Sequence, residues 1–184
     1  MRPVVPLSRW ILFWVIALTG ASFDLATKRA IFARVGEPGS PPVSLIKNVL
    51  ELRTSYNKGA LWGFGKNFEY SAQVFASLSI IAALAIVYWL FVKRAAVDAW
   101  LTAALALIMA GALGNCYDRL TLGSVRDFVY FHIDPLNFEF AIFNFADNML
   151  VAGAIALMCL AIRPEQSEAL EVAPSANVET EAVA

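Results

Sequence analysis

The residues best suited to chemistry in this 184-residue chain are ionisable and amide side chains that lie within or beside long apolar stretches. Such side chains are costly inside a bilayer and usually have a function there. They fall into three groups, each spaced so that its members share one face of a helix. The groups are Asp24 with Lys28, Asn115 with Asp118 and Arg119, and Asn144 with Asp147 and Asn148.

Two aspartates differ from the others because no obvious basic partner is left for them. Asp127 lies in the segment VRDFVYF and Asp147 in FNFADNML. Two carboxylates that share a low-dielectric site with too little counter-charge raise one pKa and hold one proton between them. An aspartyl protease needs this state, because one carboxylate takes a proton from water while the protonated one polarises the scissile carbonyl. Asp24 and Asp118 have a simpler interpretation as ordinary ion pairs at helix ends, Asp24 with Lys28 and Asp118 with Arg119.

The elements that must position these residues are four apolar stretches of roughly membrane-spanning length. The chain is 59% hydrophobic and only 16% charged, a composition that favours a bilayer over water. Backbone polar groups in hydrocarbon must be satisfied internally, so the stretches are predicted to be helices. They cover residues 8–25, 70–92, 96–116 and 143–162.

Two long connections, residues 29–69 and 117–142, must lie on the same side of a membrane that the chain crosses four times. Residues 43–57 are rich in β-formers, and the segment from Val125 to Ile133 is also strand-like. We expect a small β-structure at the membrane surface, which the second segment either joins or flanks. The ends of the first and third helices and the start of the fourth reach the same surface, so the polar groups gather at one leaflet. Residues 1–163 are expected to form one membrane domain, and residues 164–184 a disordered tail.

Several other classes of site are disfavoured by composition. The formal charge of −1 gives no basic surface for nucleic acid. The single histidine, His132, has no companion ligand, so no metal site is predicted. The helix assignment places Cys116 and Cys159 near opposite membrane faces, too far apart for a disulfide, and each is expected to be a small buried apolar side chain.

Five short motifs occur in order along the chain: DLATK at 24–28, NKGALWG at 57–63, GALGNCYDR at 111–119, VRDF at 125–128 and FNFAD at 143–147. In order and spacing they resemble the motifs of lipoprotein signal peptidase, also called signal peptidase II. Each motif is short, but five in order on a four-helix profile are specific. The sequence departs from the family pattern at Lys58, Trp62, Ala110 and Asn148.

The resemblance implies a four-helix membrane bundle with a small extracytoplasmic β-cradle and a surface loop, and a catalytic pair formed by Asp127 and Asp147. The implied supporting and substrate-binding residues are Asp24, Lys28, Asn57, Gly59, Gly111, Asn115, Arg119 and Asn144. The implied reaction is hydrolysis of the peptide bond before the diacylglyceryl-cysteine of a prolipoprotein, without a metal or organic cofactor. The implied setting is the bacterial inner membrane, with both termini cytoplasmic, membrane lipids around the helices, and the enzyme acting as a monomer.

The distribution of Lys and Arg residues predicts the opposite orientation in the membrane from the one that the resemblance implies. Nine of the 14 Lys and Arg residues fall on the side of the two long connections. Taken literally, the positive-inside rule would place that side in the cytoplasm. Two other functions remain open at this level. One is a proton- or ion-coupled carrier that uses Asp24, Asp127 and Asp147, and the other is a structural membrane subunit in which the polar residues only cap or join helices.

Overall fold

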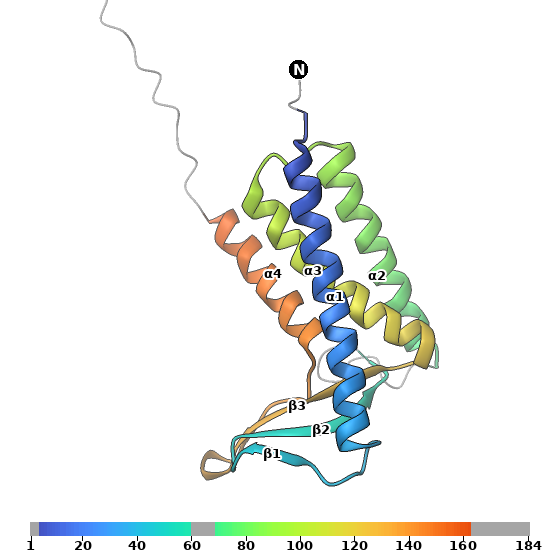
Figure 1. The fold of residues 1–184 in the computed structure, drawn as a ribbon, viewed down its shortest axis with the longest axis vertical. Coiled ribbons are helices and arrows are strands. Elements are labelled where there is room, and N and C mark those ends of the chain that lie inside the picture. Colours follow the sequence, from blue (N-terminus) through green and yellow to red (C-terminus); the bar gives the residue numbers. More distant parts are fainter. Residues whose placement is uncertain (1–3, 60–68, 163–184) are drawn as a thin grey trace, which may run out of the picture.

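The computed structural model describes residues 4–59 and 69–162, and within them a helical bundle carries a small sheet at one end (Figure 1). The N-terminal end of the first helix lies at the end of the bundle opposite the sheet. The helices are α1 (Leu7–Val35), α2 (Ser71–Val87) with a π-helical turn η2 (Tyr88–Val92), α3 (Ala99–Leu122) and α4 (Phe145–Ala161). The strands are β1 (Val43–Ile46), β2 (Leu50–Asn57), β3 (Val125–Ile133) and β4 (Phe138–Glu139), with a 3-10 turn η3 (Asp134–Leu136) before β4.

Helix α3 is the centre of the bundle and packs against each of the other three helices. Small residues allow this, because they let helix backbones approach closely. A Cβ added at Gly111 would collide with the carbonyl oxygen of Ala146 on α4, and one added at Gly153 would lie 2.6 Å from Cγ1 of Ile108. The glycines therefore fix how near α4 comes to α3, and α4 begins at the site described below.

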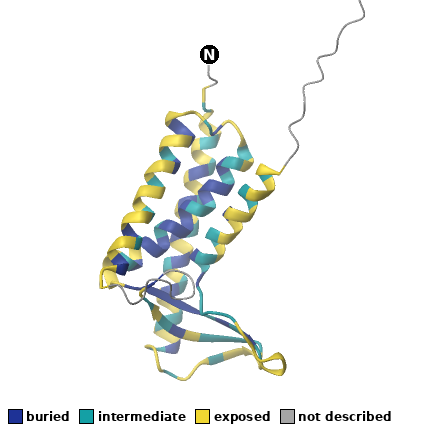
Figure 2. Cartoon of the chain, turned by 180° about the vertical axis from the view of Figure 1, so that it is seen from behind, coloured by how far each residue is buried: buried dark blue, intermediate teal, exposed yellow. Residues whose placement is uncertain are grey.

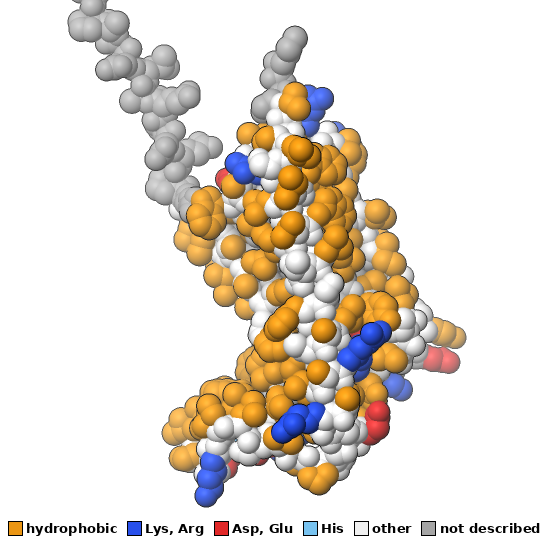
Figure 3. All heavy atoms as spheres, viewed as in Figure 1, with side chains coloured by type: hydrophobic (Ala, Val, Ile, Leu, Met, Phe, Trp, Pro, Cys, Tyr) orange, Lys and Arg blue, Asp and Glu red, His pale blue; other side chains and the backbone are white. Residues whose placement is uncertain are grey.

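The outer surface of the bundle is apolar. Exposed residues run along the outsides of the helices in Figure 2, and hydrophobic side chains cover the opposite face of the bundle in Figure 3, with Lys and Arg gathered toward its two ends. Three helical segments of the described chain are long and apolar enough to cross a membrane, Leu7–Val35, Ser71–Val92 and Ala99–Leu122. Helix α4 is apolar but shorter, at 17 residues. The prediction of several apolar helices is thus confirmed.

Two helices extend beyond the apolar stretches from which they were predicted. Helix α1 continues ten residues past Leu25 to Val35, and α3 continues past Cys116 to Leu122. In both helices the helical hydrogen bonding continues beyond the apolar residues. It ends at a glycine with positive φ, Gly36 after α1 and Gly123 after α3. The extra turns of α1 pack on β2 and β3, where the rings of Phe32 and Tyr56 lie 5.4 Å apart.

The four strands form one antiparallel sheet in the order β1-β2-β3-β4. The predicted strand segments are therefore confirmed, and the second joins the first. Asn57 pairs with Val125, and Ser55 with Asp127, so the last residues of β2 and the first of β3 lie together. Phe143 bridges to Val129 and leads the chain directly into α4. This register brings Asn57, Asp127 and the start of α4 to one place.

One prediction about the cysteines is wrong. Cys116 is buried as expected, but Cys159 is exposed on the outside of α4, and both are free. The apolar segment around Cys159 has an outward face as well as an inward one, and hydropathy alone does not distinguish them. The predicted tail at 164–184 and part of the predicted surface loop, including Ala60 and Gly63, lie outside the described residues.

Candidate active site

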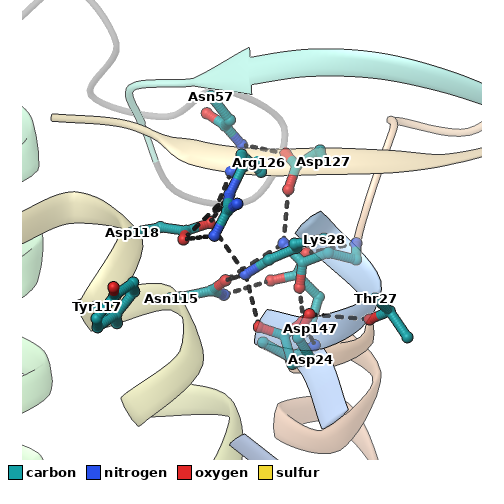
Figure 4. Close-up of polar contacts among 12 residues, drawn as sticks. Asp24, Thr27, Lys28, Asn57, Asn115, Tyr117, Asp118, Arg126, Asp127 and Asp147 are labelled. Atoms are coloured by element: carbon teal, nitrogen blue, oxygen red, sulfur yellow. Dashed lines mark hydrogen bonds and ion pairs between the residues drawn. The ribbon is translucent and has the colours of Figure 1, made fainter. Parts of the chain in front are cut away.

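The polar side chains gather where the sheet meets the ends of α1 and α3 and the start of α4. Figure 4 shows them converging, with Asp127 extending from β3 and Asp147 from α4. Five elements contribute: α1, β2, α3, β3 and the first turn of α4. Most of these side chains are buried, and Asp24, Lys28, Asp118 and Asn144 have no exposed surface.

Asp127 is a buried carboxylate held by two amides. Its Oδ1 accepts a hydrogen bond from Nδ2 of Asn144 at 2.6 Å, and its Oδ2 accepts one from Nδ2 of Asn57 at 3.1 Å. Only 3% of the residue is exposed. Burial, followed by the charge of Asp147, raises the pKa of Asp127 from 3.8 to about 7, even though both amides and Lys28 oppose the change. The carboxyl group therefore keeps its proton to a much higher pH than an ordinary aspartate and is about half protonated near neutral pH.

Asp147 is held by the geometry of a helix N-terminus. Asn144 is the N-cap of α4 and forms a capping box with Asp147: the Asp147 N–H donates to Oδ1 of Asn144 at 3.0 Å. In return, Oδ2 of Asp147 accepts from the backbone N–H of Asn144 at 3.1 Å. Its other oxygen, Oδ1, accepts from Nδ2 of Asn115 at 2.8 Å. The motif FNFAD thus sets the rotamer of Asp147 locally.

Asn144 and Asn115 connect the two carboxylates. Nδ2 of Asn144 donates to Asp127 and also to Oδ1 of Asn115 at 3.2 Å, while Asn115 donates to Asp147. An amide donates and accepts at once, so two amides can link two acceptor-only groups. The result is a continuous chain of hydrogen bonds from Asp127 to Asp147.

A second buried group, of ion pairs, supports the first. The Lys28 ammonium contacts Asp24 at 2.7 Å, Oδ1 of Asn115 at 2.8 Å and Asp118 at 3.4 Å. Asp24 also accepts from the backbone N–H of Ala146 at 2.8 Å, which ties α1 to the first turn of α4. The i,i+4 pairing expected for Asp24 and Lys28 is present.

The expected pairing of Asp118 with Arg119 is wrong. Asp118 pairs with Arg126, whose Nη2 lies 2.6 Å from Oδ1, and with Lys28. Adjacent helical residues point in different directions, so Asp118 turns inward while Arg119 turns toward α2. Nη2 of Arg119 donates to the carbonyl oxygen of Gly59 at 3.1 Å. Arg119 also interacts electrostatically with Asp147 and Asp127.

An open cleft of about 410 Å³ lies beside Asp147. Its polar end is formed by Asn115, Arg119 and Asp147, and the rest is apolar. The apolar lining comes from α2, α3 and α4: Phe75, Leu78, Ala82, Ile108, Ala112, Leu150 and Val151, with Ser79 beside them. An extended or helical apolar segment could thus lie along the bundle with one end at the carboxylate.

The structure brings together the residues singled out from the sequence. Asp24, Lys28, Asn57, Asn115, Asp127, Asn144 and Asp147 lie in one hydrogen-bonded network; Arg119 and Gly59 bound it, and Gly111 sets the spacing of α3 and α4. Two buried members were not among the predicted site residues: Asp118, which was expected only to pair with Arg119, and Arg126. A usable signal existed, because Arg126 is the one Lys or Arg in the largely apolar strand segment VRDFVYFHI.

Comparison with known proteins shows the family. The model of a family described as signal peptidase (SPase) II matches residues 16–163. The chain belongs to the signal peptidase II family. The matched residues include every polar side chain of the network described above.

Relatives and solved structures of the family agree. A lipoprotein signal peptidase from Rhodopirellula baltica is 38% identical over 165 residues, which is 83% of this chain and 72% of that protein. Another, from Pseudomonas fluorescens, is 38% identical over 117 residues, covering 62% of this chain and 67% of that protein. A bacterial membrane enzyme solved at 2.3 Å has a TM-score of 0.70 and 33% identity, covering 81% of this chain and 86% of its own. A second, at 1.9 Å, has a TM-score of 0.70 and 32% identity, covering 82% and 92%.

Proposed function

We propose that Asp127 and Asp147 are the catalytic pair of this enzyme, and that they cleave a prolipoprotein before its diacylglyceryl-cysteine. Membership of the signal peptidase II family makes the chain an aspartic peptidase that removes signal peptides from prolipoproteins. The observation that carries the residue assignment is the linkage of two carboxylates from different elements, one of them buried enough to keep a proton near neutral pH.

The chemistry follows from one shared proton. A water between the two carboxyl groups gives its proton to the ionised carboxylate as its oxygen attacks the scissile carbonyl carbon. The protonated carboxyl donates a hydrogen bond to the carbonyl oxygen, which gains negative charge. When the tetrahedral intermediate collapses, the amine of the new N-terminal residue takes a proton from the pair. The enzyme returns to its singly protonated state without any other reactant.

The other network residues would hold the pair in this state. Asn144 and Asn57 donate to Asp127 and oppose the rise of its pKa, and Asn115 donates to Asp147. Lys28 is paired with Asp24 and Asp118, and its charge opposes the raised pKa of Asp127 without cancelling it. Arg119 lines the cleft and donates to the carbonyl oxygen of Gly59, so both would be available to contact the substrate backbone. The apolar cleft would accept the acyl chains or the apolar signal segment.

The membrane arrangement is part of the same proposal. Residues 1–163 form one inner-membrane domain of four spans acting as a monomer, and α4, about 25 Å long, is the shortest span. The sheet end faces the extracytoplasmic side and both termini face the cytoplasm. Supporting this, the polar network lies at one end of the bundle, where a substrate anchored in that leaflet would present its bond.

The assignment is tested by the variants Asp127→Asn and Asp147→Asn, with a purified diacylated precursor as substrate. Each should leave the protein folded and reduce processing by at least about 1,000-fold, since each removes one half of the acid-base pair. Asp134→Asn is the matched control, an exposed aspartate near the other end of the sheet, and should process normally. Normal processing by either test variant would remove that residue from the mechanism.

Orientation is tested separately in a Cys159→Ala background. Ser44→Cys on β1 and Val97→Cys before α3 are both exposed and lie at opposite ends of the bundle. A membrane-impermeant maleimide added to intact spheroplasts should label position 44 and spare position 97. The reverse pattern would place the sheet in the cytoplasm, as the charge count suggests.

A further inference from the structure

Arg126 is adjacent to Asp127 in β3, yet its side chain is committed to a different partner. Nη2 donates to Oδ1 of Asp118 at 2.6 Å, and Nε lies 3.2 and 3.3 Å from the two oxygens of the same carboxylate. The Arg126 backbone N–H adds a further bond to Oδ2 of Asp118 at 3.1 Å. Backbone and side chain of one strand residue thus clamp one helix residue, with 10% of the Arg126 side chain exposed and none of Asp118.

The clamp joins the two halves of the candidate site. Along the backbone, it fixes the start of β3 on α3 and therefore the position of Asp127. Through side chains, Asp118 contacts Lys28, Lys28 donates to Asn115, and Asn115 donates to Asp147. Both proposed catalytic carboxylates therefore depend on the same contact, one through the neighbouring peptide and the other through three side chains.

Arg126 balances the charge of the buried ion-pair group. Lys28 and Arg126 are two cations that contact two carboxylates, Asp24 and Asp118. This half of the network is neutral, so the third contact of Lys28 goes to the amide of Asn115. Without Arg126, Asp24 and Asp118 would share one cation, and Lys28 would be drawn toward Asp118 and away from Asn115. A buried carboxylate left without its partner is strongly unfavourable.

We propose that Arg126 is a positioning residue of the peptidase: by clamping Asp118 it holds β3 on α3 and keeps Lys28 on Asn115, which together set the geometry and proton affinity of the Asp127–Asp147 pair. This inference rests on the proposed catalytic pair. It assigns Arg126 no contact with substrate, because its guanidinium is committed to Asp118 and is not part of the cleft lining.

The test compares Arg126→Gln, which removes the charge, with Arg126→Lys, which keeps the charge but not the planar fork. We expect Arg126→Gln to lower kcat about 10- to 100-fold with little change in KM, because the carboxylates are displaced while the cleft is intact. Loss of a nearby cation also raises the proton affinity of the pair, so the basic limb of the pH–rate profile should move to higher pH. Arg126→Lys should keep the position of that limb and recover part of kcat.

Two further variants provide a control and a substitute in case Arg126→Gln does not fold. Arg53→Gln removes an arginine of the same sheet that is partly exposed and paired with Glu51, and should leave kcat and the pH profile unchanged. The double variant Asp118→Asn/Arg126→Gln removes both charges at once and should fold at least as well as Arg126→Gln, which gives a measurable enzyme if the single variant does not fold. A wild-type kcat and pH profile in folded Arg126→Gln, or a wild-type kcat in the double variant, would overturn the proposal. Activity in Asp127→Asn would instead overturn the catalytic pair on which it rests.

Discussion

Replacing Asp127 by asparagine should make the protein more stable above neutral pH while destroying its activity. The reason is the raised pKa of the Asp127 carboxyl in the folded chain, about 7 against an ordinary value of 3.8. A group with a raised folded-state pKa contributes its full stability below about pH 4 and loses that contribution as the pH rises through about 7. Above that pH the folded protein must hold an unfavourable buried charge, which asparagine does not carry.

The size of the effect can be worked from the contacts. The interval between 3.8 and about 7 corresponds to about 4 kcal/mol of preference for the protonated form. Asparagine offers one oxygen and one NH₂ group to the two donors, Asn144 and Asn57, so one hydrogen bond is lost at a cost of about 1 kcal/mol. The net gain at pH 8 is about 3 kcal/mol, which corresponds to an increase in Tm of about 5–10 °C for a chain of this size.

The assay is thermal unfolding of detergent-solubilised protein from pH 4 to pH 8.5, comparing wild type with Asp127→Asn. The difference in Tm should be close to zero or slightly negative at pH 4 and should rise through pH 7. Asp98→Asn is the matched control, because Asp98 is exposed and asparagine caps the start of α3 equally well. A Tm difference that does not change with pH, or an Asp127→Asn variant that melts below wild type at pH 8, would refute the reasoning.

Three further outcomes are expected. Because the pair must hold one proton, kcat/KM should fall about tenfold per pH unit above roughly pH 7, as measured on the diacylated precursor. Gly111→Val should lower Tm and processing together, since its side chain would push against the Ala146 carbonyl at a cost of about 1–3 kcal/mol, whereas Ala154→Val on the exposed face of α4 should do neither. Asn144→Ala should reduce processing by well over tenfold, because it removes the N-cap of α4 and both amide hydrogen bonds of the side chain. Asp98→Ala, which removes only the N-cap of α3, should lower the free energy of unfolding by about 1 kcal/mol and leave processing intact.

Local pattern was sufficient for much of the fold and for most of the candidate site. Apolar stretches of spanning length predicted the helices, and β-rich segments predicted β2 and β3, because both signals depend only on neighbouring residues. The pairing of Asp24 with Lys28 follows from i,i+4 spacing on one helix. The Asn144–Asp147 capping box likewise spans three residues, so its geometry is encoded in FNFAD itself.

Tertiary structure decided the partners that lie far apart in the chain. No local signal states that Asp118 turns from Arg119 to Arg126, or that Lys28 reaches Asn115 across 87 residues, because those contacts depend on how α1, α3 and β3 pack. The inward or outward direction of Cys159 on an apolar helix was equally undetermined, since both faces are apolar. The sequence by itself singled out the groups proposed to carry the chemistry and predicted that they gather at one end of the bundle. The packing of small residues between helices and the register of the sheet determined which atoms those groups touch.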